Sequence, residues 1–217
     1  MDKNLNAAVM LRLENVKNAL EKNNMNAFIV QSKAEARSIA ASLMHEGAVV
    51  ANGGSMSLFE CGMMDILRSG KYEYLDREKV EDKIALYKKS FCADYYLCSS
   101  NAVTEKGELY NVDGNGNRVA CIAYGPEKVI MIVGRNKIVK DLDEAQARVK
   151  RYAAPANCQR LSCKTYCYEK GVCMGEGGSM TDGCRAEGRI CSQYIVSGFQ
   201  RLKGRINVIL VNEELGY

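Results

Sequence analysis

The chain has 217 residues, of which 47% are hydrophobic, so a folded protein with a sizeable core is expected rather than a disordered one. Its net charge of +4 comes from 30 basic and 26 acidic residues without a long run of like charge, which argues against nucleic-acid binding as the main role. No apolar stretch is long enough to span a membrane, and the start "MDKNLN" does not resemble a secretory signal, so we expect a cytoplasmic protein.

The first half of the chain alternates between helical and strand-like segments. Leu13, Val16 and Leu20 belong to an apolar repeat with spacings of three and four, which predicts an amphipathic N-terminal helix over about residues 4–23. Short apolar runs predict buried strands, and longer periodic runs between them predict helices. The strands are expected at 27–30, 48–52 and 93–98, and the helices at 32–47, 56–70 and 77–91.

The second half contains several strand-like runs in succession. These runs are 108–112, 117–124, 128–134 and 205–212. "DGNGN" (113–117) suits a tight hairpin, and a helix over 141–153 is expected to fade at Pro155. The pattern predicts a single α/β domain over residues 1–217, with a mostly parallel sheet, helices on both faces and an antiparallel extension.

Cysteines are concentrated near the end of the chain. Five of the ten lie between Cys163 and Cys191, within a predicted cysteine-rich insertion at about 158–191. Their spacings contain neither the C-x2-C of a zinc ribbon nor a ferredoxin pattern. A reducing compartment disfavours disulfides, so metal ligation and free packed thiols are the two interpretations that remain.

Two stretches resemble a known family. The segment "NGGSMSLFECGMMDIL" (52–67) and the segment 101–157, which begins "NAVTEKGELYNVDGNGNR", are similar to the lactate-utilisation domain family, called LUD or LutC-like. The resemblance extends from about Leu11 to the closing "INVILVNEELGY". It implies the fold of sugar-phosphate isomerases and CoA transferases, and a link to the oxidation of L-lactate to pyruvate beside iron–sulfur subunits.

The resemblance also bears on the cysteines. Many relatives carry a cysteine motif that ends in Arg-Ile-Cys, and "RIC" ends here at Cys191. The metal ligands that this implies are Cys167, Cys173, Cys184 and Cys191, with Cys163 as a spare that could replace one of them. The stretch "MGEGGSMT" departs from the usual pattern by its length. Four thiolates suit zinc or an iron–sulfur cluster, and free thiols packing a flap are the alternative.

Gly53, Gly54 and Ser55 lie where an apolar strand runs into a helix. Glycines let the backbone approach a ligand, and the exposed amides at the start of a helix attract anions. A tight turn in which Ser55 caps the helix is the alternative. Because related folds bind phosphate or CoA near such loops, the resemblance favours a site for CoA or a phosphorylated ligand.

Polar residues gather after the strand that ends near residue 98. Open α/β sheets bind ligands at the carboxyl ends of their strands, so we expect a site there. The residues expected to line it are Asn101, Thr104, Asn117 and Arg118. Arg118 would act as a fork that grips a carboxylate or phosphate. "TEKG" is similar to the element that carries the nucleophilic glutamate of CoA transferases, which implies Glu105 as nucleophile; a solvated hairpin is the alternative.

Asn136 and Lys137 directly follow the strand 128–134. Lys137 could supply a point charge for an anion at the same edge, or the pair could belong to an ordinary polar loop.

Three functions follow from these features. The first is a LutC-like protein of L-lactate utilisation that binds a small anionic metabolite and a metal. The second is an enzyme similar to a CoA transferase or a sugar-phosphate isomerase. The third is a non-enzymatic module that docks an iron–sulfur subunit of a lactate-oxidising complex. We also allow for a homodimer, and expect neither nucleic acid nor a membrane as partner.

Overall fold

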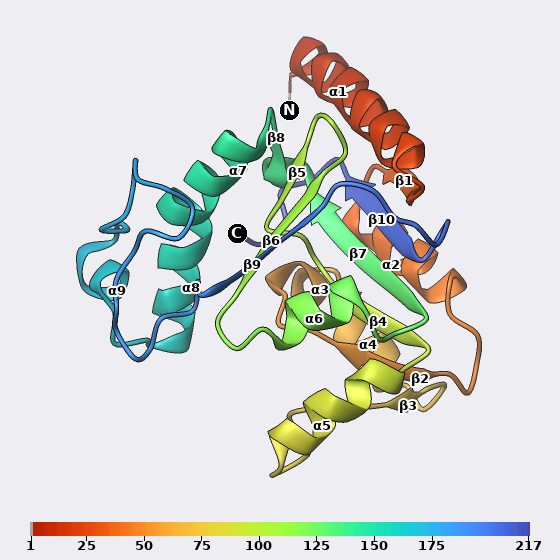
Figure 1. Cartoon of the computed structure of the whole chain (residues 1–217). Coiled ribbons are helices and arrows are strands. Elements are labelled where there is room, and N and C mark those ends of the chain that lie inside the picture. The colour runs from red at the N-terminus through yellow and green to blue at the C-terminus, as the bar shows by residue number, and fades with distance from the viewer. Residues whose placement is uncertain (1) are drawn as a thin grey trace.

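The computed structural model describes residues 2–217 and has two sheets with helices around them (Figure 1). The larger sheet has six strands in the order β1-β10-β7-β4-β2-β3, and every neighbouring pair is parallel. Its strands are β1 (Asn26–Val30), β2 (Val49–Asn52), β3 (Glu73–Tyr74), β4 (Tyr95–Cys98), β7 (Lys128–Gly134) and β10 (Ile206–Val211). The central strands β7 and β10 are almost wholly apolar because helices cover both of their faces.

Each face of this sheet packs against its own set of helices. One face carries α1 (Lys3–Lys22) and α6 (Asn117–Ala123), which bury residues such as Leu13 and Ile122 against it. The other carries α2 (Lys33–Ser42), α3 (Met56–Glu60) and α4 (Met63–Leu67), with Leu58 and Met63 in the core. The expected α/β class with helices on both faces is therefore confirmed.

The second sheet is the expected antiparallel extension. Its four strands are β8 (Ile138–Val139), β5 (Ala102–Thr104), β6 (Leu109–Asp113) and β9 (Gln193–Ser197), in that order. The β5–β6 and β6–β9 pairs are antiparallel, whereas β5–β8 is parallel. The helices α7 (Leu142–Arg148) and α8 (Ala154–Leu161) follow, joined by a π-helical turn at Val149–Ala153. Residues from this part form a smaller core around Tyr110 and Ala145.

The remaining helical elements are short. They are α5 (Lys83–Lys89), α9 (Tyr166–Lys170), and the short 3-10 turns Ser90–Cys92 and Arg135–Lys137. In Figure 1 the cysteine-rich segment with α9 lies beyond α8, to one side of the parallel sheet. Among residues 2–217, no helix has both the length and the apolar character needed to cross a membrane.

The strand expected at 117–124 is wrong, because these residues form α6. Gly116 adopts a left-handed conformation (φ 82°) directly before the helix. The Asp113 carboxylate then accepts hydrogen bonds from the backbone N–H groups of Arg118 (2.7 Å) and Val119 (3.1 Å). A carboxylate that satisfies two free amides stabilises the first turn of a helix, so "DGNGN" starts a helix and not a hairpin.

Several expected helix boundaries are also wrong, since the helix expected at 32–47 ends at Ser42 and the one expected at 56–70 is divided into α3 and α4. The helical stretch does not fade at Pro155, because the π-helical turn precedes it and Pro155 falls in the first turn of α8, where its missing N–H is tolerated. The helix expected at 77–91 begins only at Lys83, where the Asp82 side chain caps it by accepting from the N–H of Ala85 (2.9 Å). Residues 77–82 are consequently a loop.

Candidate functional site

A cavity of about 780 Å³ opens at the carboxyl edge of the parallel sheet. The loops after β2, β4 and β7 contribute Gly54, Ser99 and Lys137 to its lining, and α8 contributes Arg160 from another side. The volume falls within the usual range for ligand sites, and open α/β sheets place their ligands at this edge. The expected position of the site therefore coincides with the main cavity.

The lining carries an excess of positive charge. Six basic side chains face three acidic ones. The basic residues are Arg77, Lys83, Arg118, Lys137, Arg160 and Arg189, and the acidic ones are Glu78, Asp113 and Glu187. Two of the three acids are already engaged, since Glu78 pairs with Arg68 and Asp113 with Arg118. The remaining field favours an anionic ligand.

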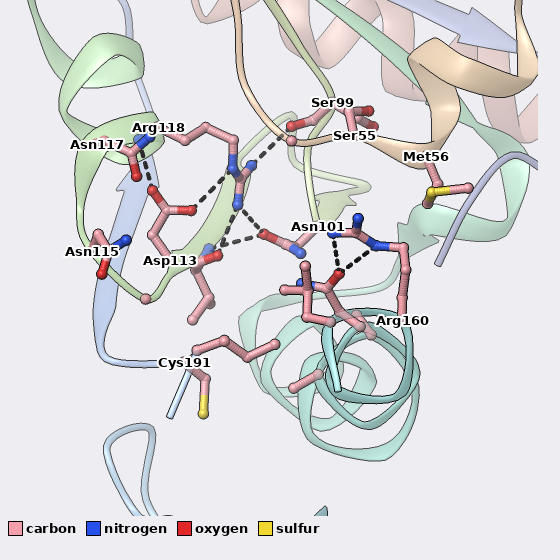
Figure 2. A pocket seen from close by; sticks show the side chains of 18 of the residues that line it. Ser55, Met56, Ser99, Asn101, Asp113, Asn115, Asn117, Arg118, Arg160 and Cys191 are labelled. Carbon is pink, nitrogen blue, oxygen red and sulfur yellow. Dashed lines mark hydrogen bonds and ion pairs between the residues drawn. The ribbon is translucent and has the colours of Figure 1, made fainter. Parts of the chain in front are cut away.

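Arg118 is buried and uses all five of its N–H donors within the protein, a set that we call the Arg118 network. Figure 2 shows its guanidinium directed toward Ser99 and Asn101, with Asp113 beside it. The acceptors are Asp113 Oδ1 (3.2 Å), Ser99 O (3.0 Å), Asn111 Oδ1 (2.7 Å), Asn101 Oδ1 (2.8 Å) and Val112 O (2.8 Å). Arg118 lines the cavity as expected, but all of its donors are used to hold the loop after β4 against strand β6.

Lys137 lies in the same cavity with a different set of partners. Its Nζ donates to Ser57 Oγ (2.9 Å) and Ser99 Oγ (3.1 Å), and its side chain is 3% exposed. It forms no ion pair with any carboxylate of residues 2–217. Burial, together with the nearby charges of Arg148 and Arg118, lowers the pKa of Lys137 from its ordinary value to about 7.

Arg77 was missed by the sequence analysis. Its half-buried guanidinium lies beside Gly54, where an added Cβ would stand 3.4 Å from Nη1, and it forms no hydrogen bond with any other residue of 2–217. The sequence predicts one helix over 77–91, whereas Arg77 lies in the loop before α5. Asp82 before an apolar run is a helix-start signal that could have shown that 77–82 is a loop. We refer to Arg77 and Lys137 together as the open cations.

The residues of the glycine loop, Gly53, Gly54 and Ser55, have two different roles. Gly54 and Ser55 line the cavity, and Ser55 also caps α3 by accepting from the N–H of Leu58 (3.4 Å). Gly53 does not line it. An added Cβ at Gly53 would lie 2.8 Å from Tyr96 Oη and 2.9 Å from Arg118 Cδ, so this glycine makes room for the Arg118 network.

The other expected ligand-binding residues are also divided. Asn101 and Asn117 line the cavity, whereas Asn136 lies outside its lining. Asn136 donates to Gly216 O (2.9 Å) and accepts from the N–H of Leu215 (3.1 Å). These bonds hold the C-terminal segment so that Tyr217 lines the cavity. The Tyr217 hydroxyl is buried and has no hydrogen-bond partner within residues 2–217.

Thr104 and Glu105 lie at the β5–β6 turn and do not line the cavity. Thr104 is fully buried and its hydroxyl donates to Glu108 Oε2 (2.8 Å). The Glu105 side chain is 44% exposed and pairs with Arg12 of α1 (2.7 Å). The nucleophilic role of Glu105 stays a prediction, and it draws no support from the position of the cavity.

The predicted cysteine ligands lie in two places. Cys167 Sγ lies 3.5 Å from Cys158 Sγ, and both thiols are buried. Cys173 and Cys191 line a second, very small cavity, and Cys184 is near enough to contribute to the raised pKa of Cys191, which burial mainly causes. Among residues 2–217, no three His, Cys, Asp or Glu side chains are grouped so that they could hold a metal ion. The metal site stays a prediction.

Comparison with protein families gives a match to the LUD domain over residues 13–211. The chain belongs to the LUD-domain family. This assignment agrees with the resemblance noted from segments 52–67 and 101–157, and the family is associated with lactate utilisation. No curated protein matches this LUD-domain chain.

Among solved structures, the LUD-domain chain is similar to a DUF162 family protein from Deinococcus radiodurans, with 14% identity and a TM-score of 0.52. The similarity covers 95% of this chain and 98% of that one, and it shows a shared fold. A second match, with 17% identity and a TM-score of 0.34, is to eIF2B delta from Chaetomium thermophilum, and covers 52% of this chain and 50% of that one.

Proposed function

We propose that this LUD-domain protein is a LutC-like component of L-lactate utilisation that binds a small anionic metabolite in its main cavity. The observation that carries the proposal is the pair of open cations. Within residues 2–217, Arg77 has no hydrogen-bond partner, and the Lys137 amine has only two serine hydroxyls. A buried or half-buried cation without a carboxylate gains most from a ligand that brings one, or that brings a phosphate.

The size of the cavity supports a second candidate function, with a larger ligand than lactate or pyruvate. Liquid water takes about 30 Å³ per molecule, so a three-carbon acid with six heavy atoms would fill less than about 180 Å³ of such a space. The cavity measures about 780 Å³. This volume favours a phosphorylated or CoA-bearing ligand, and hence an enzyme similar to a CoA transferase or a sugar-phosphate isomerase.

We keep a metal at Cys167, Cys173, Cys184 and Cys191 as a further proposal. Its support is the soft thiolate donor set, which suits zinc or iron–sulfur chemistry, and the shared small cavity of Cys173 and Cys191. The four do not fit a metal as they stand, because Cys167 packs against Cys158. Binding would require α9 to move, and elemental analysis of protein purified without oxygen tests it.

The cysteine-rich segment also supports the proposal of an iron–sulfur partner. Several large apolar side chains are exposed on it, namely Tyr166, Tyr168, Val172, Met174 and Met180. Exposed apolar groups gathered on one segment are typical of a protein–protein contact. Co-purification with co-expressed iron–sulfur subunits, and its loss when Val172 and Met174 are changed to serine, tests this part.

Thermal unfolding with a panel of ligands tests the anion site and separates the two ligand classes. The panel contains L-lactate, pyruvate, a sugar phosphate and an acyl-CoA. A ligand at 100 times its dissociation constant adds about 2.7 kcal/mol to the free energy of unfolding. We expect an anion to raise the melting temperature of the wild type, but not of Arg77→Met. Arg37→Met removes an exposed arginine outside the cavity and is the matched control.

A further inference from the structure

The hydrogen bonds around Lys137 leave one position of its amine open. Ser57 Oγ can direct its single proton to Leu215 O (3.2 Å) or to Ser99 Oγ (3.5 Å), and Ser99 Oγ directs its proton to Ser100 O (3.3 Å). Both serine oxygens therefore act as acceptors for Lys137 Nζ. A neutral amine has two N–H groups and one lone pair, so these two bonds satisfy its donors completely and leave the lone pair without a partner.

Lys137 belongs to the lining of the main cavity, where a ligand would bind. Lys137 is 3% exposed, yet it lines the main cavity at the carboxyl edge of the sheet. The charged groups that act on it are the cations Arg148 and Arg118, with the carboxylate of Glu60 acting more weakly in the opposite sense. Burial and the two cations lower the pKa of Lys137 to about 7, so a large share of the amine is neutral near neutral pH.

We propose that Lys137 is a nucleophile, whose amine condenses with the carbonyl group of an anionic aldehyde or ketone bound in the cavity. The proposal rests on the proposed function for the anion, which Arg77 would hold. It gives Lys137 a covalent role in place of a simple point charge.

The chemistry is balanced without an oxidant or a metal. The Nζ lone pair attacks the carbonyl carbon, and the carbonyl electron pair moves to oxygen. One N–H proton passes to that oxygen, which gives a carbinolamine. The second N–H proton and the hydroxyl then leave as one water molecule, and a C=N bond forms. Ser57 and Ser99 accept hydrogen bonds from Nζ at the start, and their hydroxyls lie in place to relay these protons.

Borohydride trapping of the wild-type protein tests the proposal without a variant that could fail to fold. The protein is incubated with glyoxylate at about pH 7 and reduced, and the modified lysines are mapped by mass spectrometry. We expect the reduced adduct on Lys137 to form at least roughly ten-fold faster than on exposed lysines, because much more of its amine is neutral at pH 7 than that of a lysine with the ordinary pKa of 10.5. Lys150 is the internal control, because it is similarly buried, donates to Gly175 O and Ser179 O, and does not line the main cavity.

Two further arms separate this inference from the anion site. Glycolaldehyde is a neutral probe of similar size, and Arg77→Met removes the proposed anion anchor. If glyoxylate labels Lys137 faster than glycolaldehyde does, and Arg77→Met removes this difference, both proposals are supported. Equal labelling of Lys137 by the two probes supports the nucleophile and overturns the anion site. If phosphate raises the melting temperature but Lys137 is labelled no faster than Lys150, the nucleophile is overturned and the anion site stands.

Discussion

The Arg118 network and the open cations occupy the same cavity, but the protein satisfies them to different degrees. Arg118 has five internal acceptors for five donors. Arg77 has no acceptor within residues 2–217, and Lys137 has two neutral ones. A saturated cation contributes to the fold, whereas an unsaturated one is available to a ligand. The difference shows that an arginine in a polar loop can be structural even when it lines the cavity.

The largest effect is expected from Arg118→Met. The change leaves the buried Asn111 side chain and several backbone carbonyls without a donor, and Asp113 without its partner. Removing one member of a buried ion pair destabilises by about 3–5 kcal/mol. Urea unfolding should therefore show a large loss of stability. If Arg118→Met is stable but no longer binds anions, the structural role assigned to Arg118 is wrong, because Arg118 would then be the ligand-binding group.

The next effect concerns the pH dependence of Lys137. Its pKa is about 7 in the folded protein and near its ordinary 10.5 in the unfolded chain. Between these values the unfolded chain binds more protons, so the free energy of unfolding rises with pH. From pH 7 to 9 this contribution is about 2 kcal/mol.

Lys137→Met should remove this rise. The comparison is made by urea unfolding of both proteins at several pH values between 7 and 9. Of the buried thiols with raised pKa values, Cys121 affects both proteins alike, whereas Cys61 and Cys98 also respond to the charge of Lys137 and cancel only in part. An equal slope in wild type and Lys137→Met would mean that the lysine is not held in a neutral state.

Gly53→Ala and Gly54→Ala are a matched pair of substitutions, because Gly53 packs against the Arg118 network and Gly54 lies beside Arg77. A Cβ at Gly53 would meet Tyr96 and the packed stem of Arg118 at less than 3 Å, so we expect a loss of about 1–3 kcal/mol. A Cβ at Gly54 meets only the end of the Arg77 side chain, at 3.4 Å, which can shift. Gly54→Ala should keep its stability but reduce the anion-dependent rise in melting temperature. Equal loss of stability in both variants would show that the two glycines do not differ in this way.

Tyr217→Phe should have the smallest effect on stability. Its hydroxyl is buried with no partner, so removing it costs no hydrogen bond within residues 2–217. We expect a change in unfolding free energy within about 0.5 kcal/mol, together with a weaker ligand-induced shift in melting temperature. A clear loss of stability would mean that the hydroxyl is already satisfied in the free protein.

Much of the fold could be predicted from sequence, because the parallel strands are apolar runs and α1 has a clear helical period. The failures came where a single local contact decided the outcome. The Asp113 carboxylate starts α6 in a stretch that is typical of a hairpin, and Asp82 delays α5 until Lys83. Neither contact can be derived from periodicity.

The candidate site was predictable in its location but not in the roles of its residues. Because open α/β sheets bind ligands at the carboxyl ends of their strands, the sequence predicted one site near Gly54, Asn101, Arg118 and Lys137, and all four line the main cavity. This rule could not show that all donors of Arg118 are satisfied, since their acceptors come from two separate parts of the chain, the loop after β4 and strand β6. It also missed Arg77, because the position of that residue depends on where α5 begins.

The most direct test of the account is the effect of inorganic phosphate on the melting temperature of wild type, Arg77→Met and Arg37→Met. Chloride keeps the ionic strength equal in all samples, because screening alone changes exposed charge interactions. The account predicts that phosphate raises the melting temperature of wild type and Arg37→Met, and leaves Arg77→Met unchanged. An equal shift in all three proteins, or no shift in any of them, would contradict the claim that Arg77 anchors an anion in the main cavity.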